Sequence, residues 1–326
     1  MIVKKKSLSL KRIGLEALIR RLPDHHPRKR EFENELGRVR GGEYGEKLLE
    51  QIFQKYELPF EHYIFYDLHL RSTGLFQIDA LLISERGAFI LEVKNISGRI
   101  EFPARHRQVI RTLDSGQVDS YECPSVQLDR NSMLLEDWFH ARHFTIPIHK
   151  AVVFTRSQII TGERENLTIL FPNEVPVYLR KIHHSPKVIP SGQLRKIVDS
   201  LLASHSNYSP FPLSHHYQVP KQDILKGVHC QCCGLFTMIP YQHGWRCKRC
   251  GQSDRNAHTA AILDYVMLID TSITNQRCRE FLHLTCPQKT KRLLQKSGLS
   301  AAGERRARIY HAELDSIERL WNTAMK

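Results

Sequence analysis

Two apolar stretches decide the fold of this chain: QIDALLI at Gln77–Ile83 and AFILEVKN at Ala88–Asn95. Both have the length and the apolar composition of buried strands. Each nevertheless carries charge, with Asp79 in the first and Glu92 and Lys94 in the second. Because side chains alternate along a strand, Glu92 and Lys94 share one face. Charges inside strands this hydrophobic cost several kcal/mol unless they are paired or bind a metal ion, so we expect chemistry here.

Four segments occur in a fixed order around these strands: GEYGE at Gly42–Glu46, QID at Gln77–Asp79, EVKN at Glu92–Asn95 and CPSVQ at Cys123–Gln127. Together they resemble the nuclease-related domain (NERD) family, a branch of the PD-(D/E)xK nuclease superfamily. The resemblance covers residues 41–180. It implies an α/β (α+β) class with a restriction-endonuclease-like mixed sheet flanked by helices. The family usually has Asn where this chain has Cys123, which affects one loop contact rather than the metal site.

The resemblance implies a metal-dependent site for cutting phosphodiester bonds. Asp79, Glu92 and the backbone carbonyl of Val93 would hold Mg²⁺ or Mn²⁺, hard ions that prefer oxygen ligands. Lys94 would orient the attacking water or stabilise its deprotonated form.

Two further residues belong to this expected catalytic group. Glu46, on a predicted helix, would orient Lys94 or help to bind a second ion. Gln127, on a later helix, would position the metal ligands or the substrate. Two alternatives stay open: a strand-borne ion pair of Glu92 and Lys94 with Asp79 as a neighbouring charge, and a nuclease-like fold that binds nucleic acid without cutting it.

The charge of the chain favours a polyanionic partner. Its 326 residues carry a formal net charge of +14. Residues 1–40 hold twelve Lys and Arg against five Asp and Glu, and residues 286–326 hold nine against four. We expect a nucleic-acid partner, with DNA favoured over RNA, and no membrane partner; protein partners stay unknown. No apolar run reaches the roughly 18 residues of a membrane span, and charges interrupt Leu8–Leu22, so we expect a soluble, cytoplasmic protein.

Two Cys-x-x-Cys-Gly sequences predict a small metal-stapled module. They are Cys230–Gly234 and Cys247–Gly251, and thirteen residues lie between Cys233 and Cys247. Cys230, Cys233, Cys247 and Cys250 at this spacing are typical of a tetrahedral Cys₄ zinc site, and the module is similar to a zinc ribbon. The Zn²⁺ would be structural, because a segment this short rarely folds without such a staple. Two disulfides are the alternative, and Cys232 offers an alternative ligand to Cys233.

The C-terminal segment predicts two helices and a basic hairpin. We expect helices at Asn275–Leu282, with Ser272 or Thr274 as N-cap, and at Pro287–Ser297, ended by Gly298. A basic turn then enters a short strand near Tyr310.

This order resembles a winged helix-turn-helix module over residues 257–315, in which the second helix enters the major groove of DNA. Basic or polar side chains on that helix and on the wing are the candidates to bind nucleic acid: Gln288, Lys289, Lys291, Arg292, Gln295, Arg305, Arg306 and Arg308. A small helical cap with solvated basic faces is the alternative.

These segments predict five parts: a basic helical arm (1–40), a NERD-like nuclease domain (41–180), a helix and linker (181–225), a zinc ribbon (226–256) and a winged-helix-like domain (257–326). We also expect strands at 151–154 and 175–179 and a helix at 191–204. The leading hypothesis is a metal-dependent deoxyribonuclease targeted by the two C-terminal modules. A non-catalytic DNA- or RNA-binding regulator is the alternative, and a scaffold for ribosomal RNA or an acidic protein is a third.

Overall fold

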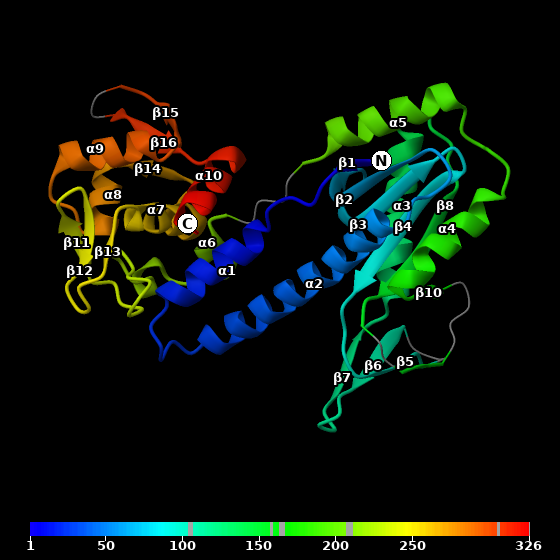
Figure 1. Cartoon of the computed structure of the whole chain (residues 1–326), viewed down its shortest axis with the longest axis horizontal. Coiled ribbons are helices and arrows are strands. Elements are labelled where there is room, and N and C mark those ends of the chain that lie inside the picture. Colours follow the sequence, from blue (N-terminus) through cyan, green and yellow to red (C-terminus); the bar gives the residue numbers. More distant parts are fainter. Residues whose placement is uncertain (104–106, 157–158, 163–166, 207–210, 305–306, 326) are drawn as a thin grey trace. The chain divides into compact units, whose positions relative to one another are not determined.

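The structure, a computed structural model, describes residues 1–103, 107–156, 159–162, 167–206, 211–304 and 307–325. The chain forms two compact units. Unit 1 comprises Met1–Ser7 and Arg40–Tyr208, and unit 2 comprises Leu8–Val39 and Ser209–Lys326. Helix α2, Lys29–Lys55, contributes residues to both units (Figure 1). The five-part division expected from the sequence is finer than this one and stays a prediction.

Unit 1 is built on a six-stranded mixed sheet in the order β1-β2-β3-β4-β8-β10. The central strands β2, β3 and β4 are antiparallel to one another, whereas β1 runs parallel to β2, and β8 and β10 extend the other side in parallel. The strands span Ile2–Lys4 (β1), His62–Arg71 (β2), Leu75–Ser84 (β3), Gly87–Lys94 (β4), Ile148–Phe154 (β8) and Thr168–Leu170 (β10). A mixed α/β architecture is therefore confirmed.

Helices cover both faces of this sheet (Figure 1). Helix α3, Pro124–His140, and helix α5, Ser191–Ser204, pack on one face through residues such as Trp138. On the other face lie α2, through Leu49, and α4, Val175–His183. The sheet is thus buried on both sides, which explains why its central strands read as nearly continuous apolar runs.

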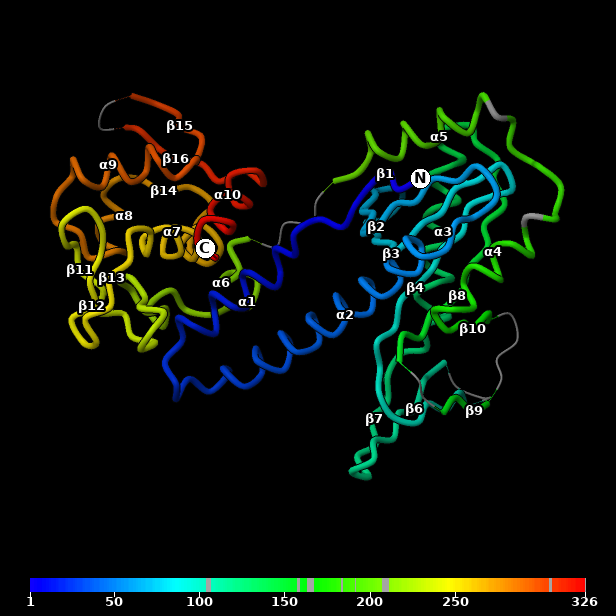
Figure 2. The backbone as a smooth tube through the Cα atoms, in the orientation of Figure 1, coloured from blue at the N-terminus to red at the C-terminus, as the bar shows by residue number. Residues whose placement is uncertain are grey.

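A smaller four-stranded sheet in the order β7-β6-β5-β9 completes unit 1. Its strands are β5 (Arg99–Glu101), β6 (Gln108–Thr112), β7 (Val118–Glu122) and β9 (Ile160–Thr161). Figure 2 shows β6 and β7 as a hairpin beyond the end of β4. Ile100 and Val109 join the core on the α3 face of the main sheet, so this sheet extends that core.

The segment 175–179, expected as a strand, is wrong: it forms the first turns of α4. Pro176 suits the first helical turn, where its missing N–H is no loss. Val175 and Leu179 are four residues apart and pack together on the sheet, which is helical spacing. A short apolar run does not by itself distinguish a strand from a helix.

Unit 2 is arranged around helix α7, Ala257–Leu268, which is buried on nearly all sides. Helix α1, Leu10–Arg21, packs in the same core. The buried carboxylate of Asp264 accepts hydrogen bonds from Arg20 and Arg21, so α1 and α7 are joined by charge as well as by apolar contact. Short helix α6, Leu213–His216, adds to this core.

Two three-stranded sheets lie in unit 2. One, in the order β11-β12-β13, comprises Met238–Tyr241, Gly244–Cys247 and Ser253–Asp254. The other, in the order β14-β16-β15, comprises Ser272–Thr274 (β14), Ser300–Ala302 (β15) and Ile309–His311 (β16). Helices α8, Asn275–Leu282, and α9, Pro287–Lys296, lie between β14 and β15 in sequence, and α10, Leu314–Ala324, follows.

Several expected elements are confirmed here. Helix α8 has the predicted bounds, and the Thr274 hydroxyl caps it by accepting from the Arg277 N–H at 3.2 Å. Helix α9 ends one residue earlier than expected, before Gly298 at φ 78°. Within the described residues, no helix combines the length and the apolar character needed to cross a bilayer.

Candidate active site

The pairing of strands β3 and β4 ends in the middle of the main sheet. Their ladder runs from Ser84↔Gly87 to Ala80↔Leu91 and stops there. Strand β4 continues beside β8 as far as Lys94, whereas β3 continues beside β2. Where the ladder stops, Oδ2 of Asp79 accepts the Val93 N–H at 2.9 Å. A side chain thus replaces the backbone partner at the point where the ladder between the two strands ends.

The facing of β2 and β3 also changes at this point. Tyr66 and Ala80 pair and face the core beneath α2 and α4, but the next pair, Leu68 and Ile78, faces the opposite core. The cause is Asp67, which lies between them with φ 52° and breaks the alternation. The charged side chains of this region therefore lie at an irregularity in the sheet, not within a regular ladder.

Lys94 is held by two partners on the α3 side of the sheet. Its Nζ donates to Oε1 of Glu92 at 2.6 Å and to Oε1 of Gln127 at 2.8 Å. The sequence expectation that Glu92 and Lys94 share a face and that Gln127 lies on a helix near them agrees with these contacts. Their catalytic roles stay a prediction.

Glu46 reaches the same group of charges from α2. The helix lies close to β4 because Gly45 has no side chain: a Cβ there would come within 2.9 Å of Cβ of Asn95 and of Oγ1 of Thr155. Asn95, which follows β4, also binds α2 directly, since its Nδ2 donates to the Gly41 carbonyl at 2.6 Å. Gly45 of GEYGE and Asn95 of EVKN are therefore packing partners, and their contact sets the position of Glu46.

The ion pair of Glu46 is with Lys6, at 2.6 Å, and not with Lys94. The sequence did not predict this role for Lys6, because the basic residues of 1–40 indicated only a surplus of positive charge. The alternation of side chains could have identified Lys6: in an extended segment, Lys4 and Lys6 point to one side and Lys5 to the other.

Burial and mutual repulsion oppose the ionisation of these carboxylates. Burial first, and then the nearby charge of Asp79, raise the pKa of Glu46 to about 7 and that of Glu92 to about 7. Burial likewise raises the pKa of Asp79. Groups that influence one another in this way lie in one cluster, so the structure brings Glu46, Asp79 and Glu92 together with Lys94 and Gln127.

The cluster fits a divalent cation in one further respect. Glu92 is 1% exposed, and its Oε2 is buried without a hydrogen-bond partner among the described residues. A buried carboxylate oxygen with no donor is costly, and a hard cation would satisfy it. Over the described parts of the chain, Glu46, Asp79 and Glu92 do not form as tight a group of ligand atoms as the cysteines of unit 2 do.

The four expected cysteine ligands come together in unit 2. The sulfurs of Cys230, Cys233, Cys247 and Cys250 all lie within 4.8 Å of one another, and this group can hold a metal ion. The sulfur pairs Cys230–Cys250 and Cys233–Cys247 are 3.6 Å apart, too far for the disulfide alternative. Cys232 is exposed and outside the group.

Local donors surround one of these sulfurs. Sγ of Cys247 receives the Arg249 N–H at 3.3 Å and lies 3.1 Å from the Thr237 hydroxyl. The hydrogen bond from Thr237 is the main reason why the pKa of Cys247 falls to about 6. Each Cys-x-x-Cys sequence forms a knuckle, and Gly234 and Gly251 follow the two knuckles with φ 72° and 78°, a conformation that favours glycine. Strand β11 begins at Met238, four residues after Gly234.

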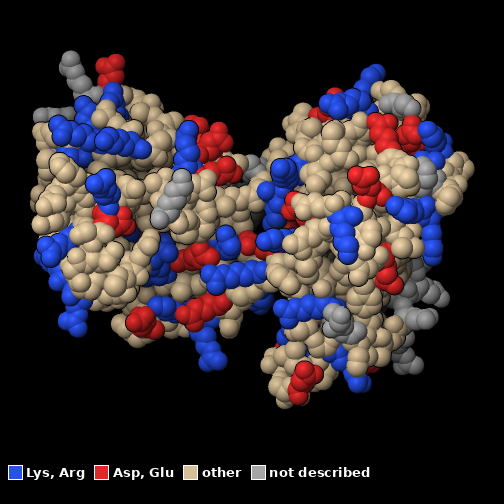
Figure 3. All heavy atoms as spheres, in the orientation of Figure 1, with Lys and Arg blue, Asp and Glu red and all other residues tan. Residues whose placement is uncertain are grey.

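The basic candidates of α9 lie on one side of that helix. Thr290 and Leu294 face the core, while Lys289 is half-buried and the remaining candidates are exposed: Gln288, Lys291, Arg292 and Gln295. Figure 3 shows Lys and Arg side chains gathered over the part of unit 2 where Figure 1 places α9. On the hairpin, Arg308 is half-buried, and Arg305 and Arg306 lie outside the described residues.

We predict that Glu92→Gln stabilises the protein in a pH-dependent way when no divalent ion is added. Folding raises the pKa of Glu92 from 4.5 to about 7, so the folded state is penalised once this group is charged. The penalty is absent below pH 4.5, grows as the pH rises, and is complete above 7. The variant should gain about 1–3 kcal/mol in unfolding free energy at pH 8 and little at pH 5, measured by urea denaturation.

Exposed Glu122→Gln is the matched control and should change little at either pH. An equal effect of Glu92→Gln at pH 5 and pH 8 would contradict the electrostatic origin of the penalty.

Residues 41–155 match the family model described as "Nuclease-related domain". The matched region includes Glu46, Asp79, Glu92, Lys94 and Gln127 and ends before the limit of 180 expected from the sequence. Comparisons with curated proteins and with solved structures gave no match. The core of unit 1, from residue 41 to residue 155, is thus a nuclease-related domain.

Proposed function

We propose that this protein is a metal-dependent nuclease that hydrolyses phosphodiester bonds of DNA. One observation carries the proposal: Asp79 and Glu92 lie where β3 and β4 part, beside the amine of Lys94, and one buried oxygen of Glu92 has no hydrogen-bond partner in the described chain. The nuclease-related domain supports nucleic acid as the substrate class.

Asp79, Glu92 and the backbone carbonyl of Val93 are the proposed ligands of Mg²⁺ or Mn²⁺. The bound ion would acidify a water molecule and offset negative charge on the phosphate. Holding such an ion would also relieve the repulsion that raises the pKa of Glu92 in its absence.

Lys94 is the proposed residue that orients the attacking water or stabilises its deprotonated form. Its partners restrict where the amine can point, since Glu92 and Gln127 hold it from two sides. Gln127 is therefore proposed as a positioning residue that acts through Lys94. Glu46 is paired with Lys6. Its proposed role is therefore to contribute negative charge to the cluster.

The cysteine group is proposed to hold Zn²⁺, because four thiolates are its typical structural ligands. Free cysteines among the described residues fit a reducing compartment such as the cytoplasm. The strand and helix order β14-α8-α9-β15-β16 supports a winged-helix-like module, in which α9 would enter the major groove. We propose that these modules direct the nuclease domain to DNA.

Cleavage of supercoiled plasmid DNA tests the nuclease proposal. With Mg²⁺ or Mn²⁺ the wild type should nick or linearise the plasmid, and Asp79→Asn and Lys94→Met should each slow cleavage by about 100-fold or more. Asn can still accept the Val93 N–H, so the first variant should keep the fold. Lys150→Met is the matched control, because Lys150 lies on the neighbouring strand and pairs with surface residue Asp129.

If the wild type binds DNA but leaves plasmid, single-stranded DNA and RNA intact with either ion, the non-catalytic binding alternative replaces the nuclease proposal. Equal loss of activity in Lys150→Met would show that the effect of Lys94→Met is not specific to the site.

Metal content tests the zinc proposal. The purified protein should hold one Zn²⁺ per chain by elemental analysis, and Cys232→Ser should keep it because Cys232 is outside the group. Cys233→Ser should lose the ion and lower the melting temperature of unit 2, since binding energy of such a site is folding energy. Zinc retained by Cys233→Ser but lost by Cys232→Ser would assign the ligand to Cys232 instead.

DNA affinity tests the role of α9. The double variant Lys291→Gln/Arg292→Gln should bind duplex DNA at least tenfold more weakly near 0.15 M salt and with a shallower salt dependence, because fewer counterions are released. The double variant Arg195→Gln/Lys196→Gln, at two exposed positions of helix α5, removes the same charge elsewhere and should change affinity less. Equal losses for both variants would mean that the net charge, not α9, determines binding.

A further inference from the structure

The first seven residues are built into unit 1. Strand β1 pairs in parallel with β2, and the buried Nζ of Lys4 donates to the carbonyls of Tyr66 and Asp67, each at 2.8 Å. These contacts fix the segment at the irregularity in β2, next to the carboxylate cluster. The segment lies outside the part of the chain that matches the nuclease-related domain.

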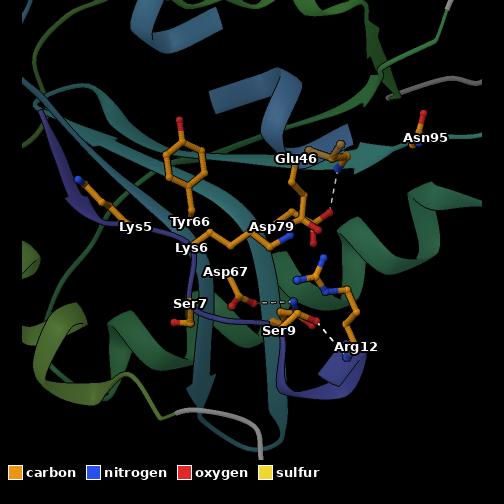
Figure 4. A network of polar contacts seen from close by, with 12 residues as sticks. Lys5, Lys6, Ser7, Ser9, Arg12, Glu46, Tyr66, Asp67, Asp79 and Asn95 are labelled. Atoms are coloured by element: carbon orange, nitrogen blue, oxygen red, sulfur yellow. Dashed lines mark hydrogen bonds and ion pairs between the residues drawn. The ribbon is translucent and has the colours of Figure 1, made fainter. Parts of the chain in front are cut away.

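This anchored segment carries the ammonium of Lys6 among three carboxylates. Lys6 lies 2.6 Å from Oε2 of Glu46, and its side chain is 25% exposed. Its positive charge also favours the ionised forms of Asp79 and Asp67. Figure 4 shows the side chain of Lys6 pointing toward Glu46 and Asp79, while Lys5 points away from them.

The other charged groups near Lys6 already have partners of their own. Asp67 is already hydrogen-bonded to His69 and to Gln77, each at 2.8 Å. Lys94 neutralises Glu92, and Lys4 is used by backbone carbonyls. Glu46 and Asp79 are thus the two carboxylates that Lys6 serves, and they are the pair that could otherwise share a cation.

We propose that Lys6 is a resident cation of the carboxylate cluster, standing in place of a second divalent ion, so that the site takes up one divalent ion and not two. This inference rests on the metal site of the proposed function. It makes Lys6 a positioning residue: it holds Glu46 beside Asp79 without adding the charge of another metal ion. Four carboxylates, those of Glu46, Asp67, Asp79 and Glu92, are balanced by Lys6, Lys94 and one divalent ion. A second divalent ion would therefore leave an excess of positive charge.

The unpartnered oxygen of Glu92 indicates where the single ion belongs. Glu92 and Asp79 would share it, whereas Glu46 stays with Lys6. Removing the ammonium leaves Glu46 and Asp79 as two neighbouring carboxylates with no cation between them, which is the donor set that Mg²⁺ and Mn²⁺ prefer.

Counting bound Mn²⁺ on the full, zinc-loaded chain tests the inference without any measurement of activity. Electron paramagnetic resonance of free Mn²⁺ and calorimetry should give one equivalent for wild type and two for Lys6→Gln. Lys5→Gln removes the same charge from the same segment and should stay at one. Lys6→Arg keeps the cation and should also stay at one.

The double variant Lys6→Gln/Glu46→Gln should return to one equivalent, because the second ion needs the carboxylate of Glu46. Thermal unfolding checks that each variant is folded. One equivalent in folded Lys6→Gln overturns the inference and leaves the proposed function intact, as do two equivalents in wild type. No Mn²⁺ bound by wild type overturns both the inference and the metal site of the proposed function.

Discussion

The hydrogen bond from the Val93 N–H to the carboxylate of Asp79 is the interaction on which the rest of unit 1 depends. It joins β3 and β4 after their ladder has ended at Ala80↔Leu91. Without it, the Val93 N–H would lack this partner at a site where backbone groups are costly to leave unpaired. With it, the strands can separate while the carboxylates stay between them. The same side chain therefore serves the fold and the candidate site.

Charge balance is the second constraint. Glu46, Asp79 and Glu92 are drawn into a region where burial penalises their ionisation, and each has a raised pKa. Lys94 from β4 and Lys6 from the segment after β1 offset part of this charge. The remaining imbalance is the electrostatic argument for the proposed divalent ion, which would also satisfy the Glu92 oxygen that has no hydrogen-bond partner among the described residues. Unit 2 meets a similar problem differently, since buried Asp264 is satisfied by Arg20 and Arg21.

The sequence predicted local features well wherever a single segment contained the whole signal. Helix α5 and helix α8 have the predicted bounds: the helical spacing of apolar residues marks α5, and the capping Thr274 marks the start of α8. The cysteine group was predicted from spacing alone, since two knuckles leave little freedom in how four sulfurs meet. The segment 175–179 failed for the opposite reason: its apolar residues suit either a strand or a helix, and packing on the sheet decided.

For the candidate site, the sequence by itself determined which residues carry charge in apolar strands, and hence Asp79, Glu92 and Lys94. Only the tertiary structure decided their partners. Lys6 reaches Glu46 because β1 pairs with β2, a contact between segments about sixty residues apart that no local pattern encodes. Likewise, Asp67 reverses the facing of β2 through one left-handed residue, which period-two alternation cannot anticipate. Periodicity fixes which side of its own element a residue occupies, whereas the pairing of distant elements fixes what that side faces.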